Sequence, residues 1–173
     1  MFPFKSKSTG SYIRDAVFAA NDGIVTTFAV IAGAQGAELT AAVVIIMGFA
    51  NLMADGFSMA SGNYLGIKSE QEYDTAHKVY LKKDINILVH PLITFIAFIG
   101  AGLLPLIPYL MKTKYEFELA ITFVVLALFS IGIVRAHFSK KQYLKDGFQS
   151  LLIGGIAAVV AYTIGYWLEN YVL

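Results

Sequence analysis

The chain contains no cysteine, few charged residues and no cluster of basic residues. Without cysteine it can form no disulfide, no thiolate metal site and no redox dithiol. Charged residues make up 14% of its 173 residues, whereas a soluble domain usually carries about 25%. The formal net charge is only +1. With no basic stripe on the chain, we exclude nucleic acid as a partner.

Motifs of common enzyme chemistry are also missing. The sequence has no Gly-rich phosphate-binding motif, no Ser/His/Asp arrangement and no His-Glu-x-x-His zinc motif. His90 and His137 lie near predicted membrane ends; they could act as metal ligands or proton-relay groups, although interfacial histidines commonly do neither. We therefore expect neither an enzyme nor an ATP-driven pump, and no bound cofactor.

Long apolar stretches dominate the sequence instead, with 57% hydrophobic residues and a mean hydropathy of +0.65. A helix needs roughly 20 apolar residues to cross ~30 Å of hydrocarbon. Five stretches meet this requirement, at about 12–33, 41–66, 87–110, 118–138 and 148–169. We predict an all-α polytopic membrane protein with one transmembrane domain, residues 1–173, and a short cytoplasmic connection at 67–86.

Proline and the basic residues refine this prediction. Pro91 suits the first turn of the third helix, whereas Pro105 and Pro108 should kink or terminate it. With the N-terminus inside, eleven basic residues are cytoplasmic and two, Lys112 and Lys114, are outside. The eleven are Lys5, Lys7, Arg14, Lys68, Lys78, Lys82, Lys83, Arg135, Lys140, Lys141 and Lys145. The positive-inside rule thus predicts a cytoplasmic N-terminus and an external C-terminus.

Small residues recur every four positions in two of the predicted helices. These rows are Ala50, Ala54, Ser58 and Gly62 in the second helix, and Ala157, Ala161 and Gly165 in the fifth. Such rows let helices approach closely in lipid. They could serve packing within one chain or an interface between subunits. Because the helix count is odd and no internal repeat is visible, the second interpretation predicts a homodimer.

Two carboxylates, Asp22 and Asp55, interrupt stretches that are otherwise suited to lipid. An intramembrane carboxylate is costly and usually faces an ion path, a proton relay or an opposite charge. Asp15 precedes Asp22 by seven residues, on nearly the same helical face, and Thr26 continues this stripe. Two plainer interpretations stay open: Asp15 could pair with Arg14 or lipid headgroups, and Asp22 could be a buried, hydrogen-bonded carboxylate that breaks the helix.

Asn51, Asp55 and Met59 also recur every four residues. A carboxylate, an amide and a thioether together suit a divalent metal of intermediate softness. A pure magnesium or calcium site would not require the thioether of methionine. Methionine alone is more often packing material. Farther along, Glu70 and Asp74 share a helical face and could collect a cation at the cytoplasmic mouth. The alternative there is a solvated helix with i, i+4 ion pairs to lysines.

Four segments, spread over nearly the whole chain, together resemble the vacuolar iron transporter family. They are RDAVFAANDGIVT (14–26), SMASGNYLGIKSE (58–70), GAGLLPLIPY (100–109) and GGIAAVVAYTIG (154–165). The resemblance implies a dimer with its translocation path between the two first helices, moving ferrous iron, and often manganese, out of the cytoplasm in exchange for protons. It matches Asp22 and Met59 to the intramembrane path and Asp15 to an acidic position near the entrance.

The chain departs from the family pattern at three places. Asn51 replaces a glutamate of the plant-like pattern, and Asp55 follows one turn later, about 5.4 Å along the helix, where that pattern has glycine. Asn63 stands where other branches have glutamate. The connection at 67–86 is too short for the larger cytoplasmic metal-binding helices of the family.

These observations lead to one hypothesis and two rivals. We expect a dimeric antiporter in which Asp15 gathers the metal, Asp22 and Asp55 alternate between metal and protons, and Met59 biases the site toward ferrous iron. It would be embedded in the plasma membrane of a prokaryote or the vacuolar-type membrane of a eukaryote. The rivals are a non-transporting membrane scaffold or subunit, and a transporter of another divalent cation.

Overall fold

The computed structural model describes residues 7–77, 86–139 and 142–172, without the side chains of residues 7–9 and 139. Every regular element in this part of the chain is a helix. The elements are α1 (Lys7–Gly36), α2 (Ala41–Ala76), α3 (Val89–Gly102), η1 (Leu104–Leu106), α4 (Ile107–Leu110), α5 (Glu116–Ser139) and α6 (Tyr143–Tyr171). With α3, η1 and α4 taken together, five helical segments are long and apolar enough to cross a membrane. The all-α prediction and the number of spans are confirmed.

Four of the five helices are longer than the predicted apolar stretches because helix formation continues into polar sequence; the third, Val89–Leu110, is not. α2 runs ten residues past its predicted end and takes in the first half of the expected connection.

The prolines act as predicted. Pro91 lies in the first turn of α3, and α3 ends at Gly102 before the tighter turn that contains Pro105. Pro108 lies in α4, the short helix that completes this span.

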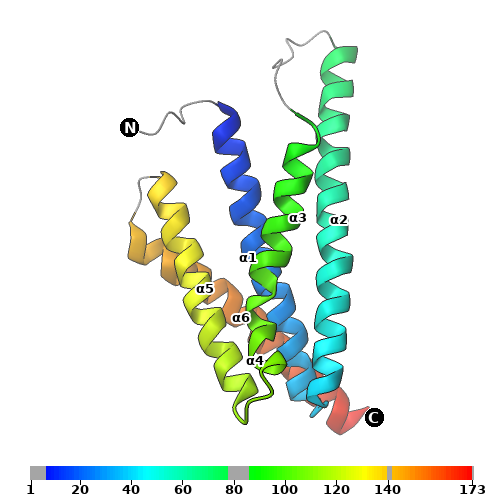
Figure 1. Ribbon diagram of the computed structural model, residues 1–173, viewed down its shortest axis with the longest axis vertical. Helices are drawn as coiled ribbons and strands as arrows, with labels where there is room; N and C mark the ends of the chain where they lie inside the picture. Colours follow the sequence, from blue (N-terminus) through cyan, green and yellow to red (C-terminus); the bar gives the residue numbers. More distant parts are fainter. Residues whose placement is uncertain (1–6, 78–85, 140–141, 173) are drawn as a thin grey trace.

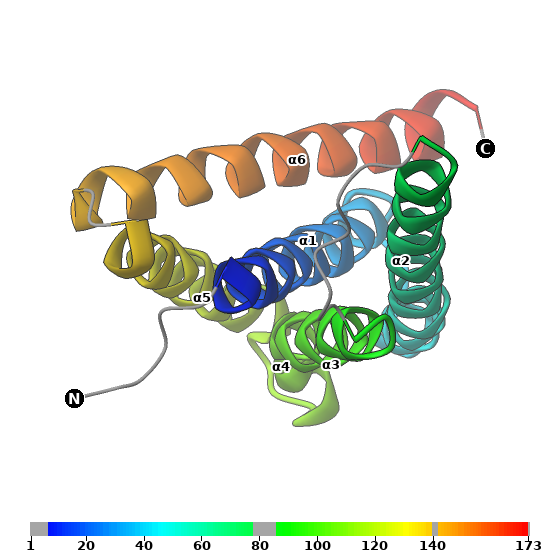
Figure 2. The ribbon, with the colours of Figure 1, turned by 90° about the horizontal axis from the view of Figure 1, so that it is seen from above.

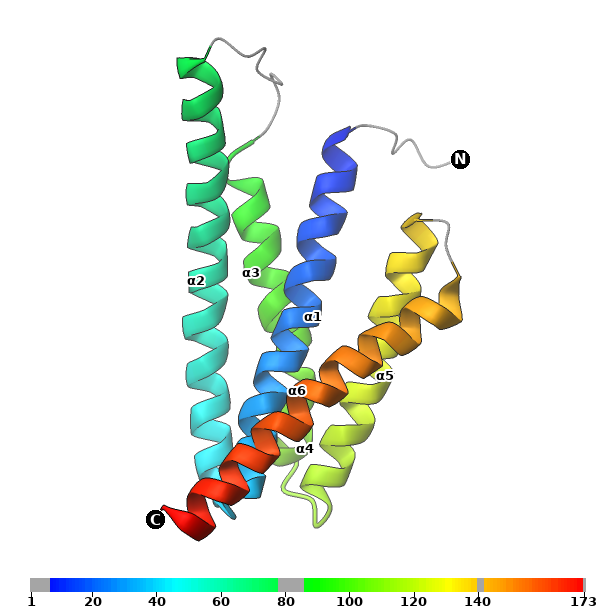
Figure 3. The same ribbon diagram turned by 180° about the vertical axis from the view of Figure 1, so that it is seen from behind.

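α1 occupies the centre of the bundle and packs against α2, α3, α5 and α6 (Figure 2). Its buried residues, among them Ala19, Ile24 and Ile31, form the core with Leu52 of α2 and Phe98 of α3. The start of α1, the end of α2 and the start of α3 lie toward one end of the molecule, whereas α6 begins nearer its middle (Figure 1). α6 crosses the bundle obliquely (Figure 3). Which side of the membrane this end faces stays a prediction.

α1 and α3 cross at a point where only glycine fits. A Cβ at Gly23 would overlap the carbonyl oxygen of Phe98, and a Cβ at Gly102 would lie 2.8 Å from the carbonyl oxygen of Gly23. These carbonyl oxygens are backbone atoms, which no side-chain rotation could move; a Cβ at Gly102 would also lie 2.5 Å from Cδ2 of Leu52. The two glycines therefore set the distance between α1 and α3, and Gly23 does so directly beside Asp22.

The two rows of small residues serve different purposes. The row on α6 packs within the chain: a Cβ at Gly165 would overlap the carbonyl oxygen of Gly33 on α1, and the Ala161 carbonyl lies 3.4 Å from the Cβ position of Gly33. The row on α2 is different. Ala50, Ala54, Ser58 and Gly62 are all exposed, and a Cβ at Gly62 would meet no described atom within 4 Å. The intramolecular interpretation thus holds for α6, and the α2 row stays open for a subunit.

Candidate functional site

Five of the seven predicted site residues lie at two levels along the face shared by α1 and α2, which we name the α1–α2 seam; Glu70 and Asp74 lie apart from it. The two helices run in opposite directions (Figure 1). Asp15 of α1 and Met59 of α2 line one cavity, and Asp22 and Asp55 form a second level farther along. Seven residues of α1 separate the levels, which corresponds to about 10 Å along the helix axis.

Asp22 and Asp55 form a carboxylate pair. Both side chains are partly buried, and they lie close enough to interact electrostatically. Neither forms an ion pair with a lysine or arginine within the described ranges. Thr26 lies one turn beyond Asp22, but its hydroxyl donates to the backbone carbonyl of Asp22 at 2.8 Å, so it supports the helix rather than the carboxylate.

Asn51 lies one turn from Asp55 on α2, and its amide is incompletely paired. Its Nδ2 atom is buried and has no hydrogen-bond partner among the described residues. Buried polar groups are nearly always hydrogen-bonded, so this amide nitrogen is an exception within the described packing. This places a third polar group near the Asp22–Asp55 level, as the spacing on α2 predicts.

The other level is a cavity of about 460 Å³ between α1, α2 and α3. Its lining residues are Arg14, Asp15, Phe18, Met59, Asn63 and Thr94. Met59 is partly buried against the hydrophobic core and also borders this cavity. The packing role that the sequence left open for Met59 is therefore present. Met59 shares this cavity with Asp15 rather than with Asp22.

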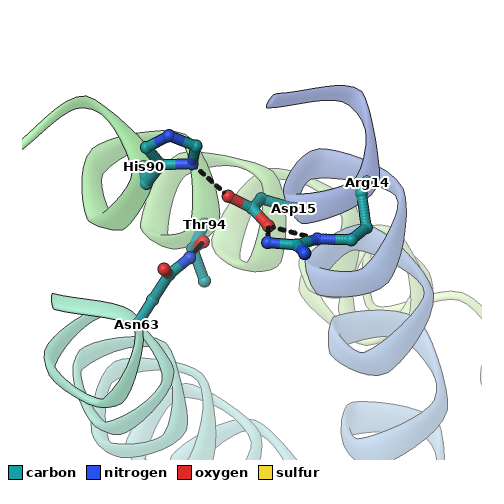
Figure 4. Close-up of polar contacts among 5 residues, drawn as sticks. All are labelled: Arg14, Asp15, Asn63, His90 and Thr94. Carbon is teal, nitrogen blue, oxygen red and sulfur yellow. Dashed lines mark hydrogen bonds and ion pairs between the residues drawn. The ribbon is translucent and has the colours of Figure 1, made fainter. Parts of the chain in front are cut away.

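Asp15 is 5% exposed, and both of its oxygens are engaged (Figure 4). Arg14 donates to Oδ1 from Nε at 3.0 Å and from Nη2 at 2.9 Å. The Nδ1 atom of His90 on α3 lies 2.5 Å from Oδ2. The pairing with Arg14 that the sequence left open is therefore present, together with a second, buried partner. That Asp15 gathers metal stays a prediction.

The polar residues on the extension of α2 are spread along its surface. Glu70 is exposed and Asp74 is partly buried. Lys68 and Glu72 form an i, i+4 ion pair at 3.9 Å, as expected of a solvated helix. The other lysines of that interpretation, Lys78, Lys82 and Lys83, lie outside the described residues, as does most of the connection from α2 to α3.

No group of three or more histidine, cysteine, aspartate or glutamate side chains that could hold a metal occurs within residues 7–77, 86–139 and 142–172. Each level of the α1–α2 seam offers one or two carboxylates with neutral oxygen or sulfur groups beside them. Among the described residues, neither level brings together more than two such carboxylates.

One residue of the cavity, Thr94, and one beside it, His90, carried little signal in the sequence. Thr94 looks like an ordinary residue of an apolar helix, and His90 was only one of two interfacial histidines. The spacing contained the clue: His90 and Thr94 lie four residues apart, on one face of α3, and both are buried. His137, by contrast, is exposed on α5, where its Nδ1 lies 3.5 Å from the hydroxyl oxygen of Tyr143.

Comparisons with known proteins agree with this architecture. The model of the VIT family matches residues 13–86 and 76–166, two segments that meet in the connection between α2 and α3. The chain is 24% identical to a vacuolar iron transporter of Toxoplasma gondii, over 95% of this chain and 76% of that protein. It is 23% identical to vacuolar iron transporter 1 of Arabidopsis thaliana, over 92% of this chain and 87% of the relative.

A third relative shows how the family varies in length. Vacuolar iron transporter homolog 3 of Arabidopsis thaliana is 24% identical over 168 aligned positions, which cover 92% of this chain and 84% of the relative. The alignment with transporter 1 needs 219 positions. Since this exceeds the 173 residues of the chain, that relative carries extra residues within the aligned region. The matched segments and the five membrane-spanning helices together show that the chain is an integral membrane protein and belongs to the VIT family.

Proposed function

We propose that the protein is a homodimeric transporter that exports a divalent metal, ferrous iron or manganese, from the cytoplasm in exchange for protons. The Asp22–Asp55 pair carries this proposal. Two neighbouring carboxylates within membrane-spanning helices, without a basic partner among the described residues, require compensation of their charge. A divalent cation supplies that compensation, and protons supply it when the cation is absent.

The exposed row of small residues on α2 supports the dimer. Ala50, Ala54, Ser58 and Gly62 would let a second copy approach closely where no described residue of the same chain covers the helix. A two-fold axis beside the α1–α2 seam would bring Asp22 and Asp55 from both copies together. Four carboxylates would then be available to one metal, and the incomplete ligand set of a single chain would be explained.

The donor set and the relatives support the choice of metal. Carboxylate and amide oxygens with one thioether, from Met59, favour a metal softer than magnesium. The Toxoplasma gondii and Arabidopsis thaliana relatives are named vacuolar iron transporters. We place the protein in the plasma membrane of a prokaryote or the vacuolar-type membrane of a eukaryote, with the basic end of the bundle in the cytoplasm.

The two levels of the α1–α2 seam suggest a sequence of steps. Metal from the cytoplasm reaches the cavity at Asp15 and Met59 and then moves along α1 to Asp22 and Asp55. Deprotonated carboxylates bind the metal, and protons arriving from the outer side compete for the same oxygens and release it. The exchange of metal for protons requires nothing beyond this competition, because carboxylates that hold the metal cannot hold protons, and protonated carboxylates cannot hold the metal.

Flux measurements in proteoliposomes test the proposal. Purified protein is reconstituted, a proton gradient is imposed, and ferrous iron transport is followed in competition with manganese, zinc and magnesium. We expect Asp22→Asn to lower iron flux by at least about tenfold, which corresponds to 1.4 kcal/mol. Glu118→Gln, which neutralises an exposed carboxylate at the start of α5, should leave flux unchanged. Full flux with Asp22→Asn would contradict the proposal. A wild-type protein without metal flux would favour a non-transporting membrane subunit.

A further inference from the structure

His90 and Thr94 of α3 each hold one residue of a neighbouring helix (Figure 4). His90 is 3% exposed and contacts Asp15 of α1 through Nδ1. Thr94 is 2% exposed, and its Oγ1 accepts a 2.8 Å hydrogen bond from Nδ2 of Asn63 on α2. Two buried polar side chains, one turn apart on α3, thus fix polar residues of α1 and α2 that line the same cavity.

The contact with His90 determines where the Asp15 carboxylate points. An ionised carboxylate only accepts hydrogen bonds, so the His90 ring donates from Nδ1. The ring is itself held, because it packs on Tyr12 with 4.5 Å between the ring centroids. Arg14 also binds Asp15, but its side chain is 72% exposed and uses only the other oxygen. Exposed ion pairs constrain a side chain weakly, so the buried contact with α3 is the stronger constraint.

His90 does not itself line the cavity, whereas Asp15, Asn63 and Thr94 do. We propose that His90 is a positioning residue for metal uptake: it orients the Asp15 carboxylate so that the carboxylate forms one wall of the cavity with Met59 and Asn63. His90 acts through Asp15 and not as a metal ligand. The inference rests on the proposed function, which names a divalent metal as the transported ion. It adds a residue of α3 to a site that the sequence placed on α1 and α2 alone.

Two substitutions separate a positioning role from simple packing. His90→Asn places an amide nitrogen near the position of Nδ1 and so keeps a donor for Asp15. His90→Leu fills a similar space and removes the donor. If His90→Leu does not fold, His90→Gln replaces it, because its amide reaches toward the Nε2 position instead. The matched control is His137→Leu, which removes an exposed histidine of α5 outside the cavity.

The measurements are Mn²⁺ affinity of the purified protein in detergent and the KM and Vmax of Mn²⁺ uptake into proteoliposomes. We expect His90→Leu to weaken binding and raise KM by on the order of ten- to a hundredfold, the effect of one buried hydrogen bond to a charged group, with Vmax within about twofold. His90→Asn should restore most of the affinity, and His137→Leu should match the wild type. In an Asp15→Asn background, His90→Leu should have no further effect, because it acts through Asp15.

Three results would overturn the inference: unchanged affinity with His90→Leu, unchanged affinity with Asp15→Asn, or an equal loss from His90→Leu with and without the Asp15 carboxylate. The proposed function fails separately. A wild-type protein that binds Mn²⁺ but moves none across the membrane would contradict transport, and the role of His90 would still be decided by the binding data. A wild-type protein that binds no Mn²⁺ would overturn both.

Discussion

Replacing Gly23 by alanine is expected to push α1 away from α3 beside Asp22. The added Cβ would overlap the carbonyl oxygen of Phe98 and would lie 3.1 Å and 3.2 Å from the carbonyl carbon and Cα of that residue. All three atoms belong to the backbone of α3. The clash can be relieved only by moving one helix, and Asp22, the neighbouring residue, moves with α1.

The magnitude follows from two opposing effects. Overpacking of a tight contact costs about 1–3 kcal/mol, and a contact with backbone belongs in the upper part of that range. Alanine in place of glycine within a helix regains about 1 kcal/mol. We therefore expect a net loss of up to about 2 kcal/mol in stability. Metal affinity should fall as well, because the distance between Asp22 and Asp55 changes.

Thermal unfolding in detergent and Mn²⁺ titration measure the two effects. The control is Gly100→Ala on α3, where the added Cβ would meet no described atom within 4 Å and only the gain in helix propensity remains. Gly100→Ala should be neutral or slightly stabilising and should bind metal as the wild type does. If Gly23→Ala is as stable and binds as tightly as Gly100→Ala, the close approach of α1 and α3 is not what positions Asp22.

Two further predictions concern α2. Met59→Leu nearly preserves the side-chain volume but removes the sulfur. The ratio of iron flux to magnesium flux, measured in competition, should therefore fall several-fold. An unchanged ratio would exclude the thioether as a source of selectivity. Gly62→Leu places a large side chain on the exposed small-residue row and should convert the dimer to a monomer in light-scattering measurements. The same change at Gly100, on α3, should leave the dimer intact, and dissociation by both substitutions would contradict an interface on α2.

The residues of the candidate site were visible in the sequence, but their contacts were not. Asp22 and Asp55 stand out because a carboxylate in an apolar helix is costly wherever that helix packs. The helical spacing that relates Asp22 to Asp15 and Asp55 to Met59 could also be read from the sequence. The sequence grouped Met59 with Asp55 on one stripe, however, whereas the structure places Met59 in the cavity of Asp15. Helical spacing identifies residues on one face without identifying the helix that this face meets.

The sequence by itself determined the class, the five spans and the breaks at proline. A bilayer requires every backbone group to be satisfied within a helix and requires a minimum apolar length, and both demands are local. Only the tertiary structure decided that His90 meets Asp15, that the α6 row packs on α1, and that no described residue covers the α2 row. The reason is that lipid and protein are equally apolar surroundings for a helix. Hydrophobicity therefore cannot reveal which face turns inward, and close packing and buried hydrogen bonds make that choice.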